Sequence, residues 1–137
     1  MKPTRSEFLH SVFVTALEGG INYWATVEAY HWRKPDAPAD ADVDTASDYE
    51  NFYATVYDHE ADDGDPSHKS LLRIDAALIE LGLARIRSAD PGIHLHRDYI
   101  RNIFYADAYY DRDDWDLDAL EADAIIQVGL FGDVIYG

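Results

Sequence analysis

Acidic residues divide this chain into segments that can build a core and segments that cannot. Nineteen of its 27 acidic residues fall in two windows, residues 36–65 and 107–123, and the first window contains no Lys or Arg. Charged side chains are almost never buried without a partner. Much of the length of these windows is therefore expected to be solvated, and most of the core must come from the apolar segments of the chain. At 47% hydrophobic content, a chain of 137 residues holds enough apolar surface for one domain.

The first segment has the pattern of a helix. Thr4 and Glu7 have the spacing of a capping box, and apolar residues follow at helical intervals as far as Leu17, where two glycines favour a helix end. The segment 25–32 is rich in β-branched and aromatic residues, which predicts a strand.

The middle of the chain predicts a loop and a second strand. Residues 33–48 combine Pro and Asp with almost no large apolar side chains, which predicts an acidic mobile loop. Residues 49–60 resume strand character. In that strand Phe52, Ala54 and Val56 are expected to face the core.

Residues 69–74 fit two readings: the start of one long helix, or a third strand followed by a helix at 76–87 that Asp75 caps. We favour the strand, because three strands are more stable than an isolated hairpin. Residues 88–92 then have the composition of a turn.

Two apolar stripes predict helices in the last third of the chain, with an acid-rich turn at 111–116 between them. The apolar tail is expected to pack on the body, although it is equally compatible with a dimer contact. The sequence therefore predicts one α+β domain over residues 1–137: an N-terminal helix, a two- to three-stranded antiparallel β-meander and three C-terminal helices. The stripes are Ile100, Ile103, Phe104 and Ala108, and Leu117, Leu120, Ala124, Ile125 and Val128.

The charge and the cysteine content limit the cellular compartments and the partners that we expect. The chain has no cysteine and no apolar stretch long enough for a signal peptide or a membrane span, so we expect a cytoplasmic protein. Its formal net charge of −16 disfavours direct binding to nucleic acid.

Two terminal motifs are distinctive: EGGINYW at 18–24 and IIQVGLFGDVIYG at 125–137. Together they resemble the ends of small acidic proteins that bacteriophages of actinobacteria encode, a group without an established activity. The resemblance implies a phage origin and a host-cell cytoplasm. It carries over no catalytic residue.

The acidic windows have a functional interpretation and a simpler one. Carboxylates at helical spacing, as at Asp107, Asp111, Asp114 and Asp118, resemble the charge density of DNA, so the chain is predicted to occupy the basic groove of a host nucleic-acid-binding or defence protein. The simpler interpretation is a solvated surface that needs no partner. The predicted partner-binding residues are Asp107, Asp111, Asp113, Asp114, Asp116, Asp118, Asp58, Glu60, Asp62 and Asp63.

Aromatic residues in the predicted strands suggest an alternative function. An aromatic face stacks nucleobases, so the chain is alternatively predicted to sequester a nucleotide or another small ligand. Cross-strand packing explains the same residues. The predicted platform is Trp24, Tyr30, Trp32, Tyr53 and Tyr57.

Catalytic and metal motifs are weak. Alternating acids at 40–44 lack the glycine and the final Glu of a calcium loop, and His94, His96 and Asp98 are explained equally well by a turn and a helix start. Standard hydrolase, phosphate-loop and dinucleotide motifs do not occur. We therefore predict a non-enzymatic inhibitor without cofactor or metal.

Overall fold

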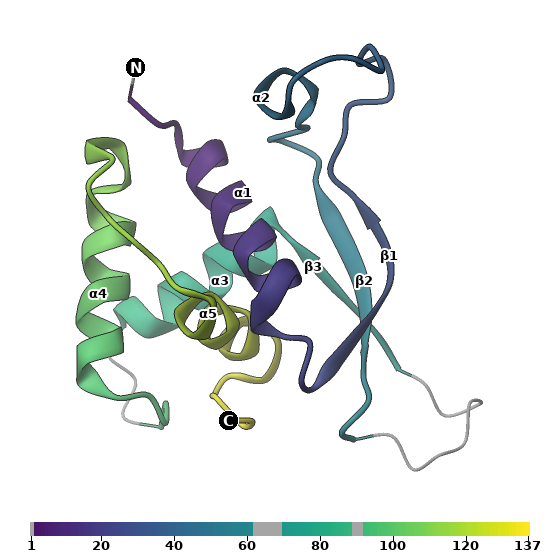
Figure 1. The fold of residues 1–137 in the computed structure, drawn as a ribbon. Coiled ribbons are helices and arrows are strands. Elements are labelled where there is room, and N and C mark those ends of the chain that lie inside the picture. Colours follow the sequence, from purple (N-terminus) through teal and green to yellow (C-terminus); the bar gives the residue numbers. More distant parts are fainter. Residues whose placement is uncertain (1, 62–69, 89–91) are drawn as a thin grey trace.

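A three-stranded antiparallel sheet packs on one side against a group of helices (Figure 1). The structure is a computed structural model that describes residues 2–61, 70–88 and 92–137. The predicted α+β class is confirmed, including the third strand. The elements are α1 (Arg5–Thr15), the π-helical turn η1 (Ala16–Gly20), β1 (Ala25–His31), α2 (Val43–Ala46), β2 (Tyr53–Asp58), β3 (Leu71–Asp75), α3 (Ala76–Arg87), α4 (Arg97–Ala108), the 3₁₀ turn η3 (Tyr110–Arg112) and α5 (Ala119–Phe131).

The sheet has the order β1-β2-β3, and the alternation predicted for β2 is confirmed. Phe52, Ala54 and Val56 are buried, because this face of the sheet lies against the helices. Tyr30 of β1 and Ile74 of β3 both pair with Ala54, so they belong to the same face. None of the described helices lies over the opposite face (Figure 1).

Strand β3 passes directly into α3 at Asp75, as predicted. The Asp75 carboxylate accepts the backbone N–H of Leu78 at 2.9 Å and thereby caps the helix. The N-terminal cap is confirmed as well, since the Thr4 hydroxyl accepts the N–H of Glu7 at 3.1 Å. Of the predicted turn after α3, residues 89–91 lie outside the described part of the chain.

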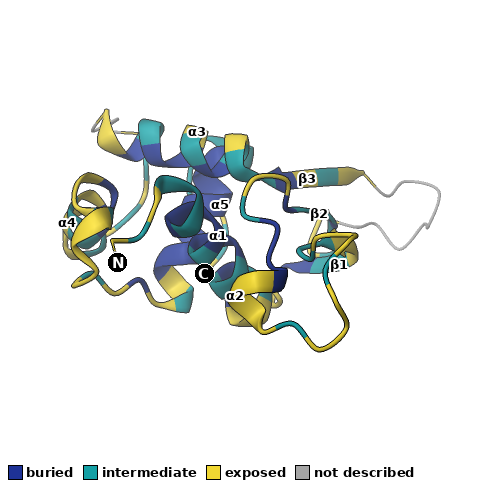
Figure 2. Ribbon diagram, turned by 90° about the horizontal axis from the view of Figure 1, so that it is seen from above, coloured by how far each residue is buried: buried dark blue, intermediate teal, exposed yellow. Residues whose placement is uncertain are grey.

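Helix α5 runs through the centre of the molecule (Figure 2), and every residue from Glu121 to Gly129 is buried. It packs closely on α3, where a Cβ added to Gly82 would lie 2.3 Å from the carbonyl oxygen of Ile125. The prediction of one apolar stripe is therefore incomplete, because this part of the helix is buried on all its faces. Leu120 of that stripe is 52% exposed, because the first turn of α5 still lies at the surface.

Helix α4 is the outermost helix, and its predicted stripe is only partly correct. Ile103 is buried, but Phe104 is 36% exposed and Ala108 is also exposed. Ala106 and Asp107 are buried instead, since the face of α4 towards α3 is rotated from the predicted stripe.

The loop predicted at 33–48 is closed at its base by hydrogen bonds. Arg33 and Ser47 form an isolated antiparallel bridge, and the N–H of Asp48 donates to the carbonyl of Trp32 at 2.7 Å. The prediction of an acidic mobile loop did not include α2, which the Asp42 carboxylate caps at the N–H of Thr45.

The tail packs on the body, as predicted. The side-chain oxygen of Gln127 accepts the backbone N–H groups of Ile135 and Tyr136 at 2.8 and 2.9 Å. The Tyr136 ring stacks on Trp24 with 5.5 Å between ring centroids. The tail therefore closes one end of the core.

Candidate functional site: an acidic ridge

Five carboxylates are exposed on the connection between α4 and α5, and we call them the acidic ridge. They occupy five of eight consecutive positions, with Arg112 as the only basic residue among them. The Arg112 guanidinium lies over the ring of Tyr109, 4.0 Å from its centroid. In the described residues no ion pair joins a ridge carboxylate to a basic side chain. The ridge consists of Asp111, Asp113, Asp114, Asp116 and Asp118.

The ridge is anchored to the core between its acidic positions. Trp115 packs edge-on against Phe8, with 5.0 Å between ring centroids, and its indole N–H donates to the carbonyl of Tyr110 at 2.7 Å. Leu117 is buried, and the Asn102 amide donates to the carbonyl of Asp116 at 2.8 Å. The packing of Trp115 and Leu117 and the hydrogen bond to the backbone of Asp116 therefore fix this segment, and its carboxylates face solvent.

The ridge does not have the predicted helical spacing. Helix α4 ends at Ala108, and Asp113 has the left-handed backbone conformation with φ of 59°. The Asp118 carboxylate caps α5 by accepting the N–H of Glu121 at 2.8 Å, in a complete capping box. The acids are displayed along an irregular segment because both neighbouring helices stop short of it.

Asp107 does not belong to the exposed surface, contrary to its predicted role in partner binding. Its side chain is 7% exposed and forms ion pairs with Arg5 and Arg87, both at 2.7 Å. Arg5 also binds Glu80. Asp107 therefore ties α4 to α1 and α3, and its charge is neutralised inside the protein.

The last two acids of the second window are also buried. Asp123 accepts hydrogen bonds from the Tyr23 hydroxyl, the Trp24 indole and the Gln127 amide at 2.6, 2.8 and 3.0 Å. Burial, followed by the bond to Asp123, raises the pKa of Tyr23 to about 12. Burial also raises the pKa of Glu121. The sequence pattern did not predict these interior acids, although the EGGINYW motif contains Tyr23 and Trp24, two of the partners of Asp123.

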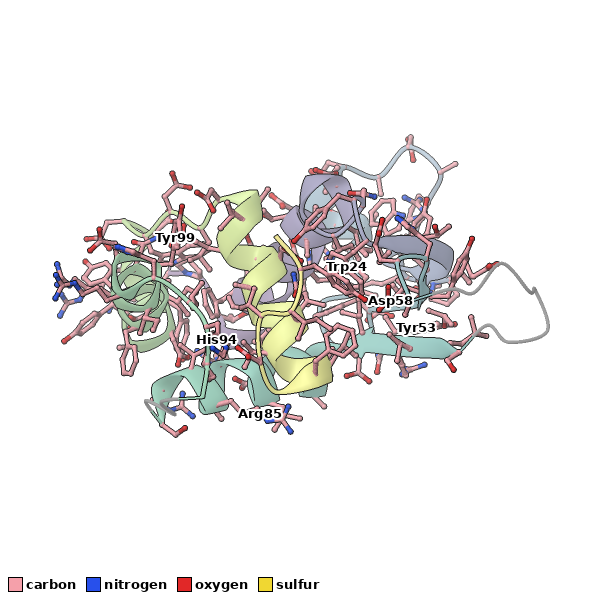
Figure 3. All side chains as sticks on the ribbon, turned by 90° about the horizontal axis from the view of Figure 1, so that it is seen from below. Trp24, Tyr53, Asp58, Arg85, His94 and Tyr99 are labelled. Atoms are coloured by element: carbon pink, nitrogen blue, oxygen red, sulfur yellow. The ribbon has the colours of Figure 1, made fainter. Side chains whose placement is uncertain are left out.

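The first acidic window is less uniform than predicted. Asp58 is half-buried and accepts the Tyr136 hydroxyl at 2.6 Å, which raises the pKa of Tyr136 to about 12. Glu60 is exposed, whereas Asp62 and Asp63 lie outside the described residues. Asp58, which is labelled in Figure 3, therefore holds the tail through this hydrogen bond.

The five predicted platform aromatics do not share one surface. Trp24 is fully buried, and Tyr53 lies on the open face of the sheet, 4.2 Å below the guanidinium of Arg73. Tyr57 is on that same face. A β-bulge between Val27 and Ala29 shifts the alternation of β1, so Tyr30 and Trp32 point to the helix side instead.

Tyr30 and Trp32 line an apolar cavity of about 550 Å³ between α1, η1 and β1. Its walls include Phe13, Leu17 and Val27, and Val43 of α2 lies at its edge. This volume is within the range of small-molecule sites. The sequence did not predict it, because the cavity depends on the bulge in β1.

A second, more polar cavity of about 650 Å³ lies where the EGGINYW segment meets the tail. Tyr23, Asp123, His94 and His96 are among its lining residues. His94 binds Asp133 at 2.6 Å, and the backbone N–H of His94 is the main cause of the lowered pKa of Asp133.

The His94, His96 and Asp98 set does not form a metal centre. His96 caps α4 by accepting the N–H of Asp98 at 3.1 Å, and the side chains of these two residues are 3.6 Å apart. No group of three or more potential metal ligands occurs within residues 2–61, 70–88 and 92–137. Likewise, none of the helices described is long and apolar enough to cross a bilayer.

Comparison with known proteins assigns no function to the surface and cavities described above. No protein family, curated protein or solved structure matches the chain.

Proposed function

We propose that this protein is a non-enzymatic accessory protein whose acidic ridge binds and inhibits a protein with a basic nucleic-acid-binding surface. The observation that carries the proposal is the arrangement of the ridge, in which Trp115 and Leu117 pack into the protein between exposed carboxylates. These carboxylates are Asp111, Asp113, Asp114, Asp116 and Asp118. A merely solvated acidic loop does not require such anchors.

Two physical effects favour this role. The net charge of −16 attracts a basic surface over a distance of about one Debye length and accelerates association. The anchored backbone reduces the entropy lost when the carboxylates engage Lys and Arg. The resemblance of the termini to phage proteins makes a restriction enzyme, a CRISPR effector or another host defence protein the preferred partner.

The test is affinity capture from an actinobacterial lysate with three forms of the protein. The ridge variant changes all five ridge residues to Asn. Asn still caps a helix at position 118 and tolerates positive φ at position 113, so the variant is expected to fold. The matched control changes five exposed acids outside the ridge to their amides: Glu18, Asp36, Asp40, Asp44 and Glu50.

The wild type and the matched control are expected to retain a DNA-binding protein that duplex DNA displaces, and the ridge variant is expected to lose it. Equal retention by the ridge variant, capture of no DNA-binding protein, or a partner that duplex DNA does not displace would each refute the proposal.

A further inference from the structure

Helix α4 has a row of exposed side chains along the side that points away from the body, and we call this row the outer face of α4. Arg97, Arg101, Phe104 and Ala108 follow one another at intervals of three or four residues, so they lie on one side of the helix. All four are exposed, and α4 lies at the edge of the molecule in both ribbon views (Figures 1 and 2). The outer face therefore faces solvent.

The two arginines of the outer face have no counter-ion within the described residues. No ion pair or hydrogen bond joins the guanidinium of Arg97 or Arg101 to another described residue, although the chain has 27 acidic residues against 11 Lys and Arg. Asp98, the exposed acid of α4, has its carboxylate 3.6 Å from the ring of His96 instead. The N-terminal half of α4 therefore carries local positive charge on a strongly acidic protein.

The acidic ridge begins at the opposite end of the same helix. The Tyr105 hydroxyl donates to the Asp114 carboxylate at 2.8 Å, which places this carboxylate beside the C-terminal half of α4. Asp111 and Asp113 follow the end of the helix at Ala108. Positive charge without a counter-ion thus lies towards one end of α4 and negative charge without a counter-ion towards the other, with apolar side chains between them.

We infer that a second copy of this protein binds the outer face, with the two α4 helices antiparallel and related by a two-fold axis near Phe104. Such an axis brings the two arginines of each copy to the C-terminal end of the other α4, where Asp111 and Asp114 lie. Each ion pair then forms twice, and the apolar side chains of the two outer faces meet at the centre. This inference does not depend on a host partner for the ridge.

The spacing along the helix fits this arrangement. Arg97 and Asp111 each lie seven residues from Phe104, so they meet across an antiparallel pair that is centred there. The net charge of −16 on each copy opposes association. We therefore expect a weak dimer, with a small interface and a dissociation constant of roughly 0.1 mM.

The test is sedimentation equilibrium of the full chain at concentrations up to about 1 mM. We expect the wild type to dimerise and the acidic variant, Arg97→Glu with Arg101→Glu, to remain monomeric. The matched control is Lys2→Glu with Lys34→Glu, which changes the net charge equally at two exposed lysines outside the outer face. This control is expected to dimerise with a dissociation constant within about threefold of the wild type.

An exchange of charges tests the contact itself. The basic variant, Asp111→Arg with Asp114→Arg, should also be monomeric, because its outer face then meets only arginines in a second copy. An equimolar mixture of the acidic and basic variants is expected to form a heterodimer, since each face again meets the opposite charge. The acidic variant keeps all five ridge carboxylates, so its capture of a basic partner tests the proposed function separately.

Three results would overturn the inference: a wild type that is monomeric up to about 1 mM, a dimer that the acidic variant retains, or no heterodimer in the mixture. A wild-type dimer that Val43→Glu separates would also overturn it, since the contact would then lie at the apolar cavity.

Discussion

Individual acids in this chain differ in role according to what surrounds them. Asp107 and Asp111 are four positions apart, yet the first is enclosed by two arginines and the second is exposed. Asp58 and Asp123 accept hydrogen bonds from aromatic side chains and hold the tail and the core. The same residue type thus serves as an internal ion pair, a hydrogen-bond acceptor and surface charge.

Replacing Asp107 should therefore cost more stability than replacing Asp111. Asp107→Asn leaves Arg5 and Arg87 without their shared counter-ion, and we expect the free energy of unfolding to fall by about 2 kcal/mol. Asp111→Asn should change it by less than about 0.5 kcal/mol. Urea denaturation measures both, and equal losses would show that Asp107 is not an internal ion pair.

The Tyr136 hydroxyl offers a test at alkaline pH. Because Asp58 raises the pKa of Tyr136 to about 12, folding favours its protonated form. The resulting stabilisation is complete below the ordinary Tyr pKa of about 10 and is lost as pH rises towards about 12.

We expect Asp58→Asn to lower the pKa of Tyr136 towards its ordinary value and to leave that of Tyr23 at about 12. NMR titration of ring-labelled tyrosine measures both groups, with Tyr136→Phe assigning the signal. An unchanged Tyr136 pKa in Asp58→Asn would contradict the contact.

At the scale of elements, structural features that depend on nearby residues were predicted from the sequence more completely than features that depend on distant elements. Caps at Thr4 and Asp75 and the alternation in β2 act within a few residues, and all were predicted correctly. The bulge in β1 and the burial of α5 from Glu121 to Gly129 depend on neighbouring elements, so no local pattern revealed them. The candidate site followed the same rule: exposed ridge acids were predicted by composition, but the interior position of Asp107 depends on arginines from distant helices.

The contact between α3 and α5 should tolerate no side chain at Gly82. Gly82→Ala places a methyl group against the Ile125 carbonyl, and we expect the free energy of unfolding to fall by about 3 kcal/mol. Gly19→Ala is the matched control, because a Cβ there has no atom within 4 Å. Thermal unfolding compares the two, and a Gly82→Ala protein as stable as the control would contradict the close packing.

At the scale of the whole molecule, the acidic ridge and the apolar cavity are formed by different segments. The ridge follows α4, whereas the cavity lies between α1, η1 and β1. Variants of one feature should therefore leave the other intact, and this independence makes a variant at the cavity an internal control for both proposals.

The central claim is that the ridge, and not the overall negative charge, recognises a basic partner. The direct measurement is the dissociation constant of the captured DNA-binding partner against salt concentration for the wild type, the ridge variant and the matched control. We expect the wild type to lose about tenfold or more in affinity between about 50 and 200 mM salt, the control to follow it closely, and the ridge variant to bind weakly with little salt dependence. If the ridge variant and the matched control lose affinity equally, the charge acts as a whole and the ridge is not the binding site.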